Sequence, residues 1–139
     1  MRCMPLFIVA LLSTLSLAPF APLAAAAQRP SSVEGRTIAA GGPIEFEHGS
    51  PSLTAEAMAT LDGVAALLRA RAGIRVVEVE VRSDTRGSAE WNLRLTAARA
   101  QAIVAYLISR GIDPRRLRAA GLGEAQPPDR PGVVLRIAA

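Results

Sequence analysis

The chain has 139 residues, of which half are apolar and a fifth are charged. This length suits one compact domain and excludes a multidomain enzyme. All sixteen basic residues are Arg, and they exceed the twelve acidic residues by only four. The chain therefore lacks the strong positive field that is typical of nucleic-acid binding.

Residues 1–27 differ in composition from the rest of the chain. Arg2 is followed by an apolar run and then by four alanines at residues 24–27. This pattern resembles a secretory signal peptide, with cleavage expected after Ala25 or Ala27. An uncleaved membrane anchor is the alternative, because the segment is long enough to span a bilayer of about 30 Å.

The single cysteine, Cys3, precedes the apolar run, whereas a lipid-modified cysteine directly follows such a run. The pattern therefore does not predict a lipoprotein. Removal of the signal segment leaves a chain that begins near Gln28 without a thiol, which excludes disulfides, cysteine-bound metals and a thiol nucleophile. We expect this mature chain to be periplasmic, with no stable membrane span.

Residues 28–41 contain Pro, Ser and Gly without a lasting periodicity, which predicts a short linker before a domain over residues 42–139. Alternating apolar and acidic residues at 44–47 predict a strand with one buried face. Thr54 is placed to cap a helix that ends near Arg71. The apolar stripe of this helix consists of Met58, Leu61, Val64, Ala65 and Leu68.

A second strand is predicted over residues 74–81, where valine alternates with glutamate. After a polar turn, Ser88 is placed to cap a long helix over residues 89–110. Short strands at 117–120 and 133–137, separated by a Gly- and Pro-rich loop, complete the chain. The element order is therefore βαβαββ, which predicts an α/β (α+β) fold: a two-layer sandwich of a small mixed β-sheet with two main helices.

The long helix carries two polar side chains within its apolar stripe. At 100° per residue, Asn92 and Arg99 share a face with the buried positions. Arg99 is costly to bury without an anionic partner, and Asp84, in the turn after the second strand, is placed to meet that need. Two interpretations are open. Asp84 and Arg99 either form an ion pair that fastens the helix to the turn, or together bind the ammonium and carboxylate of one ligand.

Two segments resemble the core motifs of the OmpA-like peptidoglycan-binding domain family, the C-terminal domain type of OmpA, Pal and MotB. They are residues 81–92 (Val-Arg-Ser-Asp-Thr-Arg-Gly-Ser-Ala-Glu-Trp-Asn) and residues 95–100 (Leu-Thr-Ala-Ala-Arg-Ala). The family shows Gly-His-Thr-Asp, Gly-Ser, Tyr-Asn and Leu-Ser-x-x-Arg-Ala in this order. The match extends to Ile-x-Phe at residues 44–46 and to Gly-Leu-Gly-Glu at residues 121–124, so it covers about residues 42–137.

The resemblance implies that this chain binds peptidoglycan noncovalently, without a cofactor, a metal or catalytic turnover. The family's Asp and Arg hold the diaminopimelate residue of the stem peptide, and these roles fall on Asp84 and Arg99. Asn92 is implied to support the site from the start of its helix. The implied location is the cell envelope, in the periplasm and in association with the outer membrane or cell wall, with other envelope proteins as further partners.

The chain departs from the family pattern at several positions. Val81 and Arg82 stand where the family has Gly and His, so Arg82 is placed to compete with the ligand ammonium for Asp84. Thr96 stands where the family has Ser, a mild change, and both Arg82 and Thr96 are candidate modulators of ligand binding. Residues 130–135 read Arg-Pro-Gly-Val-Val-Leu where the family has Asn-Arg-Arg-Val-Glu-Ile, so the paired arginines are absent.

Other functions fit the sequence less well. An enzyme is not expected, because His48 is the only histidine and no Gly-x-Ser-x-Gly nucleophile motif occurs. Three arginines within residues 115–118 lack an aromatic stacking platform, which favours a solvated turn over a nucleic-acid site. The main alternative is a divergent member that keeps the fold and serves as a periplasmic protein-protein interaction module, with Asp84 and Arg99 paired internally.

Overall fold

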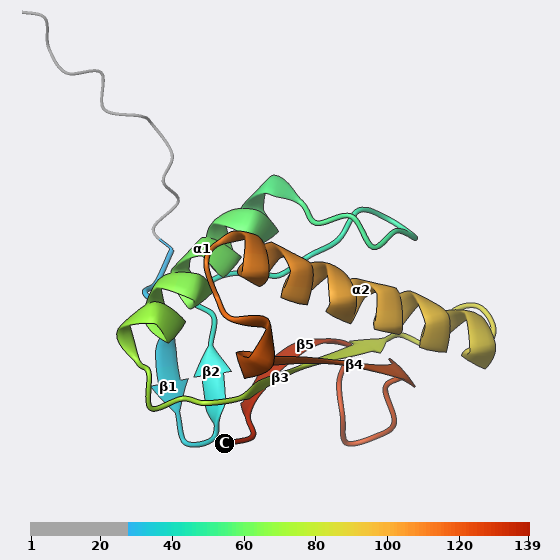
Figure 1. Cartoon of the computed structure of the whole chain (residues 1–139). Helices are drawn as coiled ribbons and strands as arrows, with labels where there is room; N and C mark the ends of the chain where they lie inside the picture. The colour runs from blue at the N-terminus through green and yellow to red at the C-terminus, as the bar shows by residue number, and fades with distance from the viewer. Residues whose placement is uncertain (1–27) are drawn as a thin grey trace, which may run out of the picture.

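One mixed sheet of five strands is covered on one face by two helices in the computed structural model, which describes residues 28–139 (Figure 1). The predicted two-layer α+β sandwich is confirmed, whereas the signal segment predicted for residues 1–27 lies outside the described residues. The helices are α1 (Ala55–Ala70) and α2 (Ala89–Ser109), with a short 3₁₀ turn η1 (Pro114–Arg116). The strands are β1 (Ser32–Glu34), β2 (Thr37–Ala39), β3 (Val77–Ser83), β4 (Leu117–Glu124) and β5 (Gly132–Ile137).

The last strand, β5, lies in the middle of the sheet, because the strand order is β1-β2-β5-β3-β4. β3 and β4 are parallel and are joined by the crossover helix α2, whereas the other neighbouring strands are antiparallel. β5 pairs with β3 along its whole length and with β2 only through Leu135 and Arg136. It therefore ties the first two strands to the rest of the sheet.

Strands β1 and β2 form a hairpin within residues 28–41, where the sequence predicts a linker. Val33 lies opposite Ile38, and Gly35 adopts a left-handed φ of 60° in the turn between the strands. Ile38 is only 3% exposed and is paired with Leu135 of β5. The prediction of a linker is therefore wrong for this hairpin, and the sheet begins before residue 42.

No strand forms at residues 44–47, although their alternating pattern predicts one. In the described structure this segment makes only an isolated bridge between Phe46 and Leu53. The segment is not one of the five strands of the sheet. The alternation still serves packing, because Ile44 and Phe46 pack against the core while Glu45 is exposed.

Each helix begins after the capping residue predicted for it. Thr54 Oγ1 accepts a hydrogen bond from the backbone N–H of Ala57 at 3.1 Å, and Ser88 Oγ accepts one from that of Trp91 at 3.1 Å. A cap of this kind contributes about 1 kcal/mol. The predicted stripe of α1 is buried except for Met58, which is 38% exposed. Neither helix in the described part of the chain is long and apolar enough to cross a bilayer.

The hydrophobic core fills the space between the sheet and the helices. β3 directs Val77, Val79 and Val81 into it, as their alternation predicts, and each is at most 2% exposed. The facing side chains come from both helices, so sheet and helices share one core. The largest of these fully buried helical residues are Leu61, Val64, Leu68, Ile103 and Leu107.

Helix α2 packs very closely on β4 at Gly121. A Cβ atom at Gly121 would lie 2.1 Å from the backbone nitrogen of Ala97 and 2.3 Å from its Cα. β4 runs through Gly121 and Gly123 to Glu124, four residues beyond the strand predicted at 117–120. The glycine therefore continues the strand, because it leaves room for the helix backbone.

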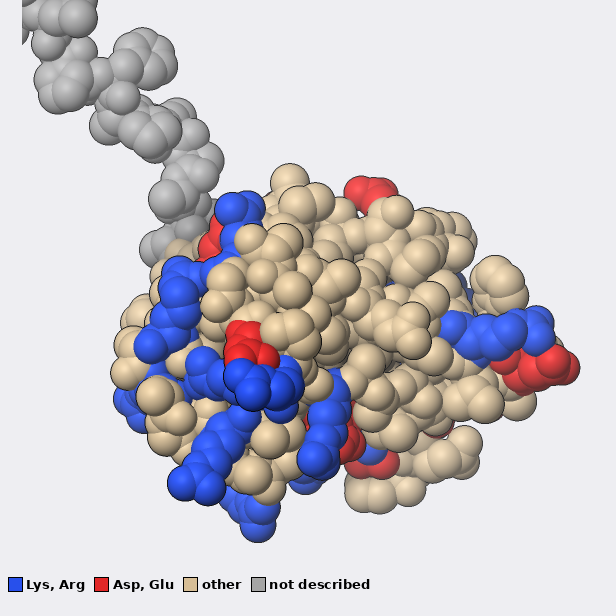
Figure 2. All heavy atoms as spheres, viewed as in Figure 1, with Lys and Arg blue, Asp and Glu red and all other residues tan. Residues whose placement is uncertain are grey.

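Arginine side chains gather at one end of the molecule, over the C-terminal end of α1 (Figure 2). Arg116 stabilises this end, because its Nη2 group donates to the carbonyl oxygens of Leu68 and Ile74, both at 2.8 Å. Arg115 pairs with Asp113 at 2.7 Å, and its hydrogen bonds lower the pKa of Asp113 to about 2. Arg115 and Arg116 therefore contact groups of the protein itself.

Candidate ligand-binding cleft

A cleft of about 710 Å³ lies where four parts of the chain meet: the end of β3 with the turn after it, the first half of α2, residues 44–49, and residues 131–133 at the start of β5. Asp84, Asn92 and Arg99 all line it. The cleft is therefore the place where the candidate residues from the sequence come together.

Asp84 presents a carboxylate at the rim of the cleft. Its side chain is 55% exposed. Oδ1 accepts a hydrogen bond from the backbone N–H of Arg86 at 3.1 Å, which stabilises the turn, and Oδ2 lies 3.6 Å from Nε of Arg86. Because the Arg86 side chain is 87% exposed, this ion pair is weak, and the carboxylate stays accessible to a ligand.

Arg99 reaches the cleft from the middle of α2. Its Nε donates to the backbone carbonyl of Ser50 at 3.0 Å, and its guanidinium carbon lies 4.9 Å from the ring centre of Phe46. Partial burial lowers the pKa of Arg99, while the negative charge of Asp84 acts in the opposite direction. The contacts described for Arg99 use Nε and the guanidinium face, which leaves the two terminal nitrogens to bind an anion.

Asp84 and Arg99 are not joined by an ion pair of 4.0 Å or less in the described part of the chain. The ion pair that would fasten the helix to the turn, which was one of the two interpretations of the sequence, is therefore not formed. Opposite charges line one cleft without neutralising each other directly.

Asn92 supports the turn that carries Asp84. The side chain is 3% exposed, and its Nδ2 donates to the carbonyl oxygen of Arg86 at 2.7 Å and to Oε1 of Glu124 at 3.1 Å. A third, longer contact of 3.4 Å reaches the carbonyl oxygen of Asp84. Asn92 thus links the start of α2 to the turn and to the end of β4.

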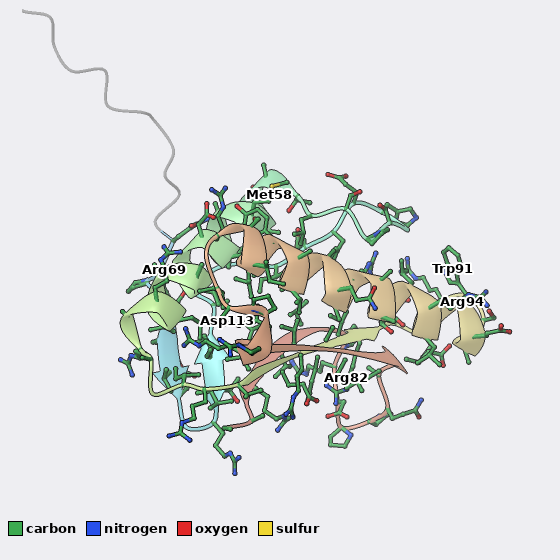
Figure 3. All side chains as sticks on the ribbon, viewed as in Figure 1. Met58, Arg69, Arg82, Trp91, Arg94 and Asp113 are labelled. Atoms are coloured by element: carbon green, nitrogen blue, oxygen red, sulfur yellow. The ribbon has the colours of Figure 1, made fainter. Side chains whose placement is uncertain are left out.

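Arg82 does not compete for Asp84 as predicted from the sequence. It pairs instead with Glu80 at 3.2 Å and with Asp129 at 3.5 Å. Figure 3 shows Arg82 on the side of the sheet opposite the helices. The reason is strand alternation, which places the side chains of residues 80 and 82 on the same face.

Thr96 is fully buried between α2 and β4 and does not line the cleft. Its hydroxyl donates to the carbonyl oxygen of Asn92 at 2.8 Å and accepts a hydrogen bond from the N–H of Gly123 at 2.9 Å. The predicted modulating residue is therefore a structural link between the helix and the strand.

Matched valine substitutions at Thr60 and Thr96 are expected to have different effects on stability. Thr60 Oγ1 is buried without a hydrogen-bond partner among the described residues, so Thr60→Val should leave the free energy of unfolding unchanged or raise it by about 1 kcal/mol. Thr96→Val leaves the N–H of Gly123 unpaired and should lower the free energy of unfolding by about 1–3 kcal/mol. Urea unfolding followed by circular dichroism tests the pair, and an equal loss in both variants would contradict it.

Three residues at the site were not assigned a role from the sequence: Phe46, Ser50 and Glu124. Phe46 and Glu124 lie in segments that carry the family resemblance, so these motifs could have marked the two residues as candidates for the site. Ser50 acts through its backbone carbonyl, which no side-chain pattern reveals. Within residues 28–139, no three His, Cys, Asp or Glu side chains lie close enough together to hold a metal ion.

Comparison with known proteins identifies relatives that cover most of the described chain. A family model described as "OmpA family" matches residues 45–133. A peptidoglycan-associated lipoprotein of Rhizobium meliloti (strain 1021) is 39% identical over 105 residues, which are 76% of this chain and 59% of that protein. One of Pseudomonas putida is 42% identical over 82 residues, 59% of this chain and 48% of that protein. The chain thus spans about half to three fifths of the length of these relatives.

Solved structures share the same architecture. An outer membrane protein from Borrelia burgdorferi B31 superposes with a TM-score of 0.62 at 23% identity, covering 77% of this chain and 94% of that one. The peptidoglycan-associated lipoprotein from Burkholderia pseudomallei gives a TM-score of 0.55 at 22% identity, covering 73% and 88%. The five-stranded sheet and its two helices define the small α+β domain that these structures have in common. With the family model matching residues 45–133, the chain belongs to the OmpA family.

Proposed function

We propose that this chain binds peptidoglycan noncovalently in the cell envelope, and that Asp84 and Arg99 hold the diaminopimelate of the stem peptide. The observation that carries the proposal is that these two residues line one cleft with opposite charges and without pairing to each other. The names of the relatives, which describe association with peptidoglycan, support the same ligand class.

The chemistry of the two residues suits a zwitterionic end group. The ligand ammonium binds the Asp84 carboxylate, whose Oδ1 is partly used by the turn and whose side chain is accessible. The ligand carboxylate binds the terminal nitrogens of Arg99, in the two-point geometry that a guanidinium favours. Recognition of this kind breaks no bond, so the proposed role is that of a binding protein and not of an enzyme.

The proposed location is the periplasm, in association with the outer membrane or the cell wall. The second candidate function is a protein-protein interaction module that does not bind the wall. Leu93 and Leu122, which are 52% and 42% exposed, favour it, because large exposed apolar side chains are common at protein interfaces.

Cosedimentation of residues 28–139 with isolated sacculi of the diaminopimelate type tests the proposal. Asp84→Asn removes the negative charge but keeps an oxygen that accepts from the N–H of Arg86. Arg99→Lys keeps the positive charge but loses the planar guanidinium that binds a carboxylate through two hydrogen bonds. Loss of a charge-assisted contact of about 1.5–3 kcal/mol should weaken binding about 10- to 100-fold. Free diaminopimelate should displace the wild-type protein from the sacculi.

Two matched variants provide the controls for this experiment. Asp129→Asn and Arg94→Lys make the same chemical changes outside the cleft and should bind as the wild type does. Two outcomes would favour the interaction module. One is a folded wild type that does not sediment with sacculi, and the other is an equal loss of binding in the control variants and in the cleft variants.

A further inference from the structure

Trp91 presents a half-exposed aromatic ring to the same cleft that holds Asp84 and Arg99. The residue lies in the first turn of α2 and is 48% exposed. Figure 3 shows its side chain projecting from the start of this helix, away from the sheet. The ring is not part of the hydrophobic core, and with 48% of the residue exposed it is accessible to a ligand.

Gly87 and Ser88 form the immediate surroundings of Trp91. The backbone N–H of Trp91 donates to the capping hydroxyl of Ser88 at 3.1 Å, which fixes the start of the helix. Gly87 has a left-handed φ of 81°, and a Cβ atom there would lie 3.3 Å from Cδ1 of Trp91. Glycine at this position therefore leaves room for the edge of the indole, which a Cβ atom would crowd.

The cleft is larger than one bound amino acid requires. Its volume of about 710 Å³ lies within the range of about 300–1,000 Å³ that is usual for pockets that bind drug-sized molecules. Asp84 and Arg99 account for the charged end group of the proposed ligand. The space beside Trp91 is left for an uncharged part of the same molecule.

We infer that Trp91 forms a second subsite, which stacks on an N-acetylated sugar ring of peptidoglycan next to the diaminopimelate site. A pyranose ring exposes a face of C–H groups that packs well on a flat indole, while the indole N–H at the ring edge is free to donate to an amide oxygen. The inference rests on the proposed function. It makes the ligand a sugar-linked stem peptide and not the amino acid alone.

Isothermal titration calorimetry with two probes tests the subsite. One probe is a stem tripeptide that ends in diaminopimelate, and the other is the same tripeptide linked to N-acetylmuramic acid. The wild type should bind the sugar-linked probe about five- to tenfold more tightly, as expected for one stacking contact. Trp91→Ala should remove this preference and leave the affinity for the plain tripeptide unchanged.

Two control variants separate stacking from a general effect on the helix. Trp91→Phe keeps a ring and should retain part of the preference. Leu93→Ala removes another exposed apolar side chain of the same helix turn, which does not line the cleft, and should retain all of it. Because Trp91 is the only tryptophan in the chain, quenching or enhancement of its fluorescence by the sugar-linked probe alone gives a second readout.

The outcomes distinguish failure of the subsite from failure of the proposed function. Equal affinity of the wild type for the two probes, or a preference that Trp91→Ala keeps, would overturn the subsite while diaminopimelate binding stands. A folded wild type that binds neither probe would overturn both the proposed function and the subsite.

Discussion

Replacement of Gly121 by alanine should lower the free energy of unfolding by at least about 3 kcal/mol. The added Cβ atom would lie 2.1 Å from the backbone nitrogen of Ala97, so α2 would have to move away from β4. Backbone atoms of a helix do not yield as a flexible side chain does, and every contact between helix and strand shifts with them. Chemical unfolding in urea, followed by circular dichroism, measures the loss.

Gly73→Ala is the matched control for this substitution. No atom lies within 4 Å of the position that a Cβ would take there, and the backbone is outside the left-handed region. We expect its free energy of unfolding to stay within about 0.5 kcal/mol of the wild type. Similar stabilities of Gly121→Ala and Gly73→Ala would show that α2 and β4 do not pack as closely as described.

Glu80→Gln is expected to lower the free energy of unfolding by about 1–2 kcal/mol at neutral pH. The Glu80 carboxylate is almost fully buried on the outer face of the sheet, where Arg136 holds its two oxygens at 2.7 and 3.1 Å. Arg82 adds a third contact at 3.2 Å. Glu78→Gln, on the same face of the same strand, removes an equal charge without these contacts and should cost much less.

The same carboxylate makes stability depend on pH. Hydrogen bonding to Arg136, with a further contribution from Arg82, lowers the pKa of Glu80, although burial opposes the shift. Its contribution is therefore complete above the unfolded pKa of about 4.3 and is lost as the pH falls through the lower folded value. Unfolding measured from pH 7 down to pH 3 should show a steeper loss in the wild type than in Glu80→Gln. Parallel curves would contradict this assignment.

The helices and the central strand could be predicted because their signals are local. Thr54 and Ser88 stand one residue before the helices they cap, and valine alternation marked the buried face of β3. The hairpin of β1 and β2 gave no such signal. Each of its strands has three residues and only one inward side chain, Val33 or Ile38, so no periodicity could develop, and its pairing with β5 depends on residues almost 100 positions away.

The sequence predicted which residues line the site better than it predicted the contacts that they make. Family motifs placed Asp84 and Arg99 together, and both line the cleft. The prediction for Arg82 was wrong because strand alternation directs this side chain to the other face of the sheet, where it pairs with Glu80. The bond from Arg99 to Ser50 spans 49 positions and ends on a backbone oxygen, so only the folded chain reveals it.

The central position of β5 sets the time at which this domain is able to fold. β5 follows every other strand and helix of the domain in the chain, and it separates β2 from β3. Until the ribosome has released β5, no strand lies between the β1–β2 hairpin and the parallel pair of β3 and β4. The two parts of the sheet are not connected before then. Closure of the five-stranded sheet therefore has to wait for its last strand.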